Sequence, residues 1–385
     1  MQDQTERSRS AAESVFERCR RLVMDASYRA EALEKTRDAH RGVVGFFSNY
    51  VPEEWLYACD LIPTRLLGLQ EHRCGDGSSL PGFYCSYVRD VYASIEQGLL
   101  GYLDAVVLPN TCDSLQGVRD VWAVGVPDTR MYPFLHPVRQ AGSREFYVAQ
   151  LVRLRKAISA DFRVDPSPAA LARAAEVYNR NRSVLARLHA RRLGKRLPFG
   201  GADFVALVTA GMILPKEEHN QMLEELERGQ DPSAGELLAD KHRLMIMGPV
   251  CDRLDLLDVI ESKGAVIVTD ALTNGTRYFL YADLELPCDD VAFARRFERQ
   301  AVSPTVTTPE RWGFVVDQAR SFRAEGLIFI CPKYCDPHIL LWPAVRLRLE
   351  AIGIPTLVLE IEHNQSDFSR EGNLVEAFLE TLQPV

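Results

Sequence analysis

The chain has 385 residues, of which 46% are hydrophobic and 25% are charged, and its formal net charge is −8. This length exceeds what one hydrophobic core usually serves, so two domains are expected. The negative charge disfavours a general nucleic-acid binder, because phosphate contacts require a concentrated positive surface. No stretch approaches the roughly 18 to 20 apolar residues of a membrane span, so no membrane partner is expected either.

The N-terminal segment, residues 1–38, has apolar positions at about helical spacing and contains no Gly or Pro, which predicts helix. Its start is polar and charged and lacks the apolar core of a secretory signal. We therefore expect a cytoplasmic protein without disulfides. The nine cysteines of the chain then require another explanation.

Residues 39–142 are predicted to form a first α/β domain, because short apolar strands alternate with helices. This alternation indicates a parallel sheet covered on both faces. The predicted strands are 42–48, 64–69, 104–110 and 129–135. The predicted helices are 52–60, one that begins near Cys85 and one that begins at Asp113.

Residues 143–240 read almost wholly as helix and are predicted to form a bridging segment. The strand and helix alternation then returns in 241–385, the second α/β domain. Its predicted strands are 244–250, 265–270, 326–330 and 355–360, and its predicted helices are 252–264 and one from Asp336. The fold class expected is α/β, with two similar doubly wound parallel-sheet domains that face each other across a cleft.

Three cysteines stand at the places where such a fold binds ligands. Cys85 opens a predicted helix, whose dipole stabilises a thiolate. Cys112 and Cys335 each follow a predicted strand and precede an aspartate. Ligands of open α/β sheets bind at the carboxyl ends of the strands, so two facing edges make a shared cleft. Three thiolates gathered there can hold an iron-sulfur cluster with one coordination position open for chemistry.

The residues alone leave a second interpretation open, in which these cysteines are buried structural thiols. Cys251 and Cys331 also lie at the ends of predicted strands and remain candidates for the same cleft. No Walker loop and no dinucleotide fingerprint occurs, so ATP and NAD are not expected to bind this chain directly. In LPKEEHNQML, Glu218 and His219 either serve a helix start or relay protons beside a cluster.

Six segments of the sequence together resemble a known superfamily from about residue 40 to the end. They are VPEEWLYACDLIPTRLLG, CSYVRD, LPNTCD, LPKEEHNQML, YCDP and DFSREGNLVEAFLE. The set is similar to the subunits of 2-hydroxyacyl-CoA dehydratases and benzoyl-CoA reductases. EEHNQML and the preceding YNRNR most resemble the C (gamma) subunit of ATP-dependent benzoyl-CoA reductase.

This resemblance implies a four-iron four-sulfur (4Fe-4S) cluster between two α/β domains, held by Cys85, Cys112 and Cys335. It also implies an acyl-CoA substrate, a related cluster-bearing partner subunit, and a separate ATP-hydrolysing iron-sulfur activator. The activity expected is that of an oxidoreductase subunit in anaerobic aromatic degradation, which reduces the ring of an aromatic acyl-CoA at low potential. Glu218 and His219 are then the candidate proton relay.

Two other functions remain open at this point. One is a 2-hydroxyacyl-CoA dehydratase, a lyase in which an electron enters the thioester carbonyl to form a ketyl, expels hydroxide and is recycled. The other is a non-catalytic electron-transfer scaffold whose partner binds the substrate. Arg370, Glu371 and Gly372 stand where many dehydratase members carry a closing Gly-Gln, which weakens assignment to the dehydratase branch.

Overall fold

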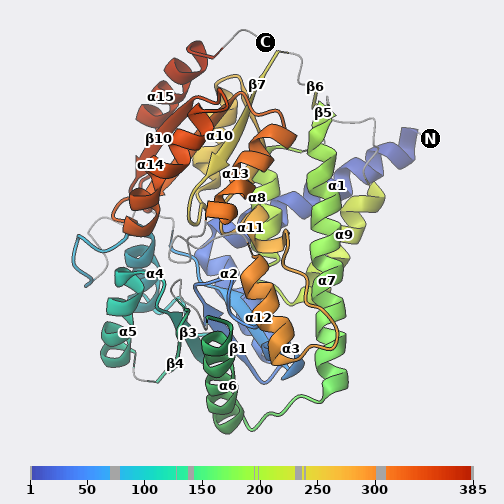
Figure 1. The fold of residues 1–385 in the computed structure, drawn as a ribbon. Coiled ribbons are helices and arrows are strands. Elements are labelled where there is room, and N and C mark those ends of the chain that lie inside the picture. Colours follow the sequence, from blue (N-terminus) through green and yellow to red (C-terminus); the bar gives the residue numbers. More distant parts are fainter. Residues whose placement is uncertain are drawn as a thin grey trace.

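The computed structural model describes residues 2–69, 79–126, 128–137, 143–194, 196–197, 199–229, 236–237, 240–300 and 309–382. The described chain is built around two parallel sheets of four strands each (Figure 1). We call each sheet, with the helices that connect its strands, the first and the second domain. The predicted fold class is confirmed, whereas the predicted domain limits of 39–142, 143–240 and 241–385 stay a prediction.

The two sheets have the same strand order. The first is ordered β2-β1-β3-β4 and the second β10-β9-β7-β8. When the strands of each sheet are numbered along the chain and the second sheet is read from its β8 edge, both orders are 2-1-3-4. The strands of the first sheet are β1 (Gly42–Phe46), β2 (Leu61–Arg65), β3 (Ala105–Pro109) and β4 (Arg130–Phe134). Those of the second are β7 (His242–Met247), β8 (Ala265–Ala271), β9 (Gly326–Pro332) and β10 (Thr356–Ile361). In this order the crevice for a ligand opens between the first and third strands of each sheet.

Helices cover the strands, which explains their apolar composition. β1, β2, β3, β8 and β9 are buried along their whole lengths, as expected for parallel strands covered on both faces. The helices of the first domain are α3 (Glu53–Ala58), α4 (Ser86–Glu96) and α5 (Asp113–Gly125). Those of the second are α10 (Leu254–Ser262), α11 (Thr276–Phe279), α12 (Asp290–Arg299), α13 (Pro309–Ser321), α14 (Asp336–Glu350) and α15 (Ser369–Glu380).

A helical layer joins the two domains. It consists of α6 (Ser143–Phe162), α7 (Pro168–Ala190), the 3-10 turn η1 (Arg191–Leu193), α8 (Gly201–Ala210) and α9 (Lys216–Gly229), with the short strands β5 (Arg196–Leu197) and β6 (Glu236–Leu237). The long helix α7 contacts α3 of the first domain and α11 of the second (Figure 1). The almost wholly helical content predicted for this segment is confirmed. None of the helices among the described residues combines the length and the apolar character needed to cross a bilayer.

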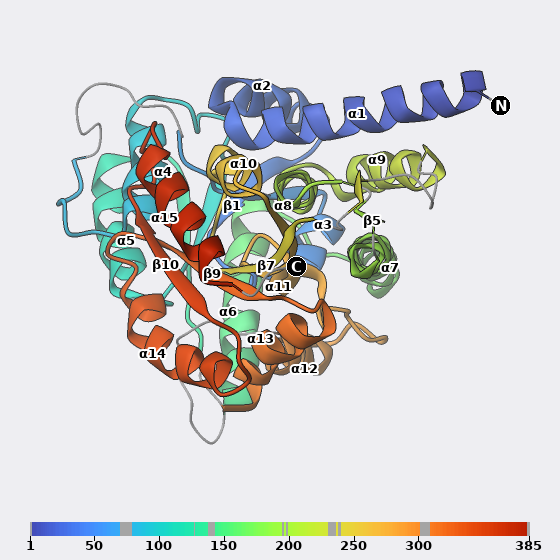
Figure 2. The same ribbon diagram turned by 90° about the horizontal axis from the view of Figure 1, so that it is seen from above.

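The helix predicted for the N-terminal segment is confirmed, and one predicted strand differs from the structure. The N-terminal segment forms two helices, α1 (Gln2–Met24) and α2 (Ala26–Arg37), which lie along one side of the molecule (Figure 2). The break occurs at Asp25, whose carboxylate accepts the Tyr28 N–H at 2.8 Å and caps α2. The second strand was predicted at 64–69 but occupies 61–65, with Pro63 inside it. Proline is tolerated there because β2 is the edge strand.

A buried ion cluster ties the helical layer to both domains. Glu54, on α3, accepts hydrogen bonds from Arg182 of α7 at 2.5 Å and from Arg296 of α12. All three side chains are at least 96% buried. Burial alone raises the pKa of Glu54, but Arg296 and Arg182 outweigh it and lower the pKa to about 2. The carboxylate therefore stays charged in the interior.

Replacing Glu54 by Gln is expected to lower the free energy of unfolding by about 3–5 kcal/mol, because two buried guanidinium groups lose their counter-charge. The folded pKa lies below the ordinary 4.5, so the stabilisation is complete above pH 4.5 and is lost as the pH falls towards 2. Denaturant unfolding at pH 7 and pH 3 measures both effects. Glu31→Gln, which removes an exposed pair with Lys35, is the control and should leave stability unchanged at either pH. Equal stability of Glu54→Gln and wild type at pH 7 contradicts the prediction.

Candidate functional site

Each of the three cysteines singled out in the sequence stands at the N-cap of a helix. Cys85 precedes α4, Cys112 precedes α5 and Cys335 precedes α14. Cys112 and Cys335 occupy equivalent places, because each opens the helix that follows the third strand of its sheet. The positive ends of three helix dipoles therefore point towards these thiols, which favours negative charge on sulfur.

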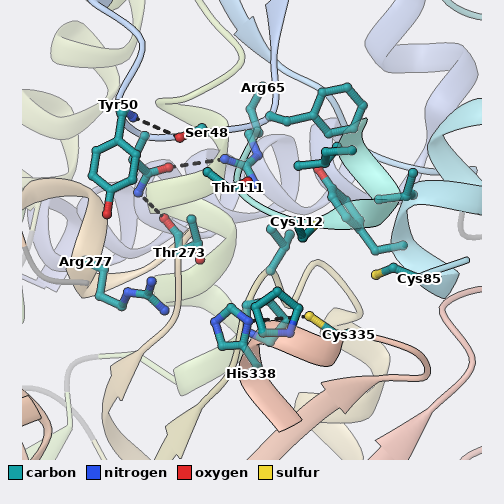
Figure 3. A pocket seen from close by; sticks show the side chains of 18 of the residues that line it. Ser48, Tyr50, Arg65, Cys85, Thr111, Cys112, Thr273, Arg277, Cys335 and His338 are labelled. Atoms are coloured by element: carbon teal, nitrogen blue, oxygen red, sulfur yellow. Dashed lines mark hydrogen bonds between the residues drawn. The ribbon is translucent and has the colours of Figure 1, made fainter. Parts of the chain in front are cut away.

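The three cysteines line one cavity between the two domains. Its volume is about 110 Å³. Cys85, Cys112 and Cys335 gather on the same side of this cavity, and Tyr50 and Arg277 lie across from them (Figure 3). Further parts of the wall come from the loops after β1 and β7, the first strands of the two sheets, and from segments that include Thr273 and Gln300. The cavity thus lies where the carboxyl edges of both sheets meet.

The thiols interact with one another. A hydrogen bond with Cys335, together with burial, raises the pKa of Cys85 well above its ordinary value, and the N–H groups of Val88 and Tyr87 oppose this shift. Burial raises the pKa of Cys112 to about 12, against the N–H groups of the first turn of α5. In the absence of a metal these thiols are protonated. A metal that binds there must displace their protons.

Two arginines from different domains give the cavity a positive wall. Arg65, at the end of β2, donates from Nη1 to Asn49 Oδ1 at 3.2 Å, and its Nε is buried without a partner among the described residues. Arg277, on α11, donates from Nη1 to the Gly248 carbonyl at 3.2 Å. No aspartate or glutamate lines the part of the cavity that the structure describes. The wall therefore suits an anionic occupant.

A buried histidine lies directly beside Cys335. His338 Nδ1 is 3.4 Å from Cys335 Sγ, and His338 Nε2 is buried with no hydrogen-bond partner in the described chain. Burial, with Arg277 nearby, lowers the pKa of His338 well below its ordinary value, so the imidazole is neutral. A neutral imidazole can donate one hydrogen bond and accept another, and it lines the cavity.

The donor set fits a cluster better than a single ion. Within the described ranges, no three His, Cys, Asp or Glu side chains converge as ligands of one metal ion. An iron-sulfur cluster is larger than an ion and is held by thiolates that surround it. Three thiols at helix N-termini that line one cavity, facing a positive wall without carboxylates among the described residues, match that requirement. The cluster expected from the sequence is therefore compatible with these residues.

Cys251 and Cys331 do not line the cavity. Cys251 follows β7, is 2% exposed, and its N–H donates to Asn274 Oδ1 at 2.9 Å. Cys331 is buried in β9, and its side chain hydrogen-bonds that of Cys335, which raises the pKa of Cys335. Of these two cysteines, only Cys331 has contact with a thiol of the cavity.

The structure places both proton-relay candidates, Glu218 and His219, in the helical layer. Glu218 pairs with Arg18 of α1 at the surface. His219 is fully buried between helices, where Nδ1 accepts from Asn181 Nδ2 at 2.8 Å and Nε2 donates to the Leu207 carbonyl at 3.0 Å. Burial lowers the pKa of His219 to about 3. Neither side chain lines the cavity, so neither stands beside the three cysteines.

Sequence reasoning missed the basic residues of the cavity wall, namely Arg65, Arg277 and His338. Of these, His338 had a detectable pattern, because it lies three residues after Cys335 and thus on the same side of the first turn of α14. Arg65 lies at the end of β2. Arg277 lies on the short helix α11, in a segment for which no element was predicted. Their convergence depends on how the domains pack.

Comparison with known proteins supports the resemblance inferred from the motifs. The family model of the 2-hydroxyglutaryl-CoA dehydratase D-component matches residues 48–382. The C subunit of benzoyl-CoA reductase from Thauera aromatica is 27% identical over 366 residues, which cover 91% of this chain and 93% of that protein.

Two dehydratase subunits are similar to nearly the same extent. The (R)-phenyllactyl-CoA dehydratase beta subunit of Clostridium sporogenes is 25% identical, with 88% of this chain and 91% of that protein covered. The beta subunit of (R)-2-hydroxyglutaryl-CoA dehydratase from Acidaminococcus fermentans is 26% identical, with coverages of 91% and 95%. Reductase and dehydratase subunits thus match this chain over nearly its whole length, and the chain belongs to the 2-hydroxyglutaryl-CoA dehydratase D-component family.

Proposed function

We propose that this chain is the iron-sulfur subunit of a benzoyl-CoA reductase-type enzyme, which reduces the ring of an aromatic acyl-CoA. The observation that carries the proposal is the convergence of Cys85, Cys112 and Cys335 on one interdomain cavity. These cysteines hold a 4Fe-4S cluster through three thiolates. When bound, the cluster supplies single electrons at low potential next to the acyl group.

The residues of the cavity have distinct tasks in this proposal. The helix N-termini of α4, α5 and α14 stabilise the thiolates. Arg65 and Arg277 stabilise negative charge that develops on the thioester as an electron enters it, since they lie in a buried site where such charge is poorly screened. His338, rather than Glu218 or His219, is the imidazole side chain that holds a proton at the cavity, because it lines the cavity.

The partners follow from the family resemblance. ATP hydrolysis belongs to a separate iron-sulfur activator that delivers electrons, which is consistent with a sequence that has no phosphate-binding glycine loop. A related cluster-bearing partner completes the enzyme, consistent with relatives that are named as subunits. We place the enzyme in the cytoplasm, where a reducing compartment keeps its cysteines available.

A second candidate function is dehydration of a 2-hydroxyacyl-CoA. It is favoured by the dehydratase subunits, whose identities of 25% and 26% are close to the 27% of the reductase subunit. In both reactions the thioester accepts an electron at the same place. The reductase is preferred because EEHNQML and YNRNR resemble the reductase subunit and because Arg370, Glu371 and Gly372 replace the closing Gly-Gln of many dehydratases.

Cys112→Ser is expected to remove most of the iron and acid-labile sulfide from the chain prepared without oxygen together with its partner subunit. Loss of one of three thiolate ligands should weaken cluster binding by at least about 10–100-fold. Analysis of iron and acid-labile sulfide per chain measures this loss of the cluster. Cys288→Ser is the matched control, because Cys288 is also half-buried but does not line the cavity. Full iron content in Cys112→Ser contradicts the assignment.

The ATP consumed per product separates the two reactions. Ring reduction needs new electrons at every turnover, so ATP use is expected to rise in proportion to product in the reconstituted system with activator and partner. Dehydration recycles its electron and needs only occasional activation. Coupled measurement of ATP hydrolysis and acyl-CoA product decides between them. A few activating events that support many turnovers exclude the reductase and favour the dehydratase.

Arg277→Gln is expected to lower kcat by about 10²–10³-fold, because a buried positive charge facing the reacting thioester is lost. Steady-state kinetics should show the effect in kcat more than in KM, with iron content unchanged. Arg295→Gln, on the exposed face of α12, is the control and should behave as wild type. A kcat close to that of wild type in a fully loaded Arg277→Gln enzyme removes Arg277 from the proposed role.

A further inference from the structure

A buried histidine lies between two buried carboxylates at the contact between the domains. His363 Nδ1 is 2.7 Å from Asp90 Oδ2, and His363 Nε2 is 2.6 Å from Asp252 Oδ1. The side chains of His363, Asp90 and Asp252 are 1%, 5% and 0% exposed. We call these three residues the His363 cluster. It lies outside the cavity with the three cysteines, and neither its histidine nor its carboxylates line that cavity.

The geometry fixes the charge of the histidine. Carboxylate oxygens accept hydrogen bonds, so both ring nitrogens of His363 must donate, which requires the imidazolium form. Burial alone lowers the pKa of His363, but Asp252 and Asp90 outweigh it and raise the pKa to about 10. His363 is therefore cationic at neutral pH, in contrast to His189, whose pKa burial lowers to about 3.

The His363 cluster connects the two domains. Asp90 lies on α4, in the crossover of the first sheet, while Asp252 follows β7 and His363 follows β10 of the second. Ion clusters of this kind are costly to bury, and their best-supported benefit is a unique arrangement of the parts they join. The arrangement fixed here is that of α4 against the second domain.

The first turn of α4 makes further hydrogen bonds to the second domain, at the segments that follow β9 and β10. Ser86 N donates to the Lys333 carbonyl at 3.0 Å, two residues before Cys335. The N–H of His363 donates to Ser86 Oγ at 3.2 Å, and Arg89 Nη2 donates to Glu362 Oε2 at 2.6 Å. The ring of Tyr87 meets that of His363 edge-on, with centroids 5.3 Å apart. Cys85, which opens this turn, is thereby held beside Cys335.

We propose that the His363 cluster is a charged interdomain clamp, and that His363 is a positioning residue which holds the Cys85 thiol against the Cys335 thiol so that two domains form one site. The assignment of that site to an iron-sulfur cluster rests on the proposed function, whereas the clamp itself does not. Both thiols line one cavity, so their proximity can be measured in a chain prepared without metal.

The test uses disulfide formation in the full-length, metal-free chain treated with diamide, followed by peptide mapping. Cys335 interacts with Cys85 and Cys112 of the first domain and with Cys331 within its own domain. The ratio of the Cys85–Cys335 to the Cys331–Cys335 disulfide therefore reports domain positioning. General loosening of the fold changes both products, whereas loss of the clamp changes only the first.

His363→Ala is expected to lower this ratio at least tenfold, and His363→Gln, which keeps hydrogen-bonding groups but not the charge, to lower it less. His189→Gln replaces a histidine that is equally buried but neutral, and it should leave the ratio within twofold of wild type. Folded His363→Ala and His363→Gln variants with an unchanged ratio overturn the proposal.

A second measurement keeps the test independent of folding in the variants. Nitrogen-15 NMR of the histidine rings in the wild-type chain at pH 8 should show both nitrogens of His363 protonated, and a neutral His363 overturns the clamp. The outcome is distinguishable from failure of the proposed function. A chain that binds no iron can still show the clamp, and an iron-loaded chain can lack it.

Discussion

The site depends on one geometric constraint, which is that the carboxyl ends of parallel strands meet at a single edge of their sheet. Both sheets are wholly parallel, and they face each other so that these edges meet. The chain must leave each edge as a helix N-terminus, and at three such points it carries a cysteine. Thiols that are up to 250 residues apart in the chain, at positions 85 and 335, are thereby brought into contact.

Much of the fold could be predicted because local pattern and tertiary structure agree. The apolar runs at β3, β8 and β9 are buried on both faces, so composition alone indicates parallel strands. The position of β2 could not be predicted in the same way. Pro63 argues against a strand unless the strand lies at an edge, and edge position is a property of the whole sheet. The helices between β8 and β9 were also missed, although Asp289 caps α12 in a recognisable way.

The candidate site could be predicted in part. Cysteines at strand ends and helix starts are visible in the sequence, and the structure places Cys85, Cys112 and Cys335 around one cavity. The roles of Glu218 and His219 were inferred from their chemistry alone, and packing places them elsewhere. His219 satisfies both of its ring nitrogens within the helical layer, so its presence is explained by the fold. Arg65 and Arg277 reach the cavity only through contacts between distant elements, which no local pattern encodes.

Because the two sheets have the same strand order, the residues that the two domains contribute to the site can be compared position by position. Cys112 and Cys335 are counterparts, since each opens the helix after a third strand. Among the described residues that line the cavity, Cys85 has no counterpart in the second domain. The connection that corresponds to its own, between β8 and β9, brings the guanidinium of Arg277 to the cavity instead. The pseudo-symmetry of the site is therefore incomplete. At this position the first domain contributes a thiol, that of Cys85, and the second contributes a cation, the guanidinium of Arg277.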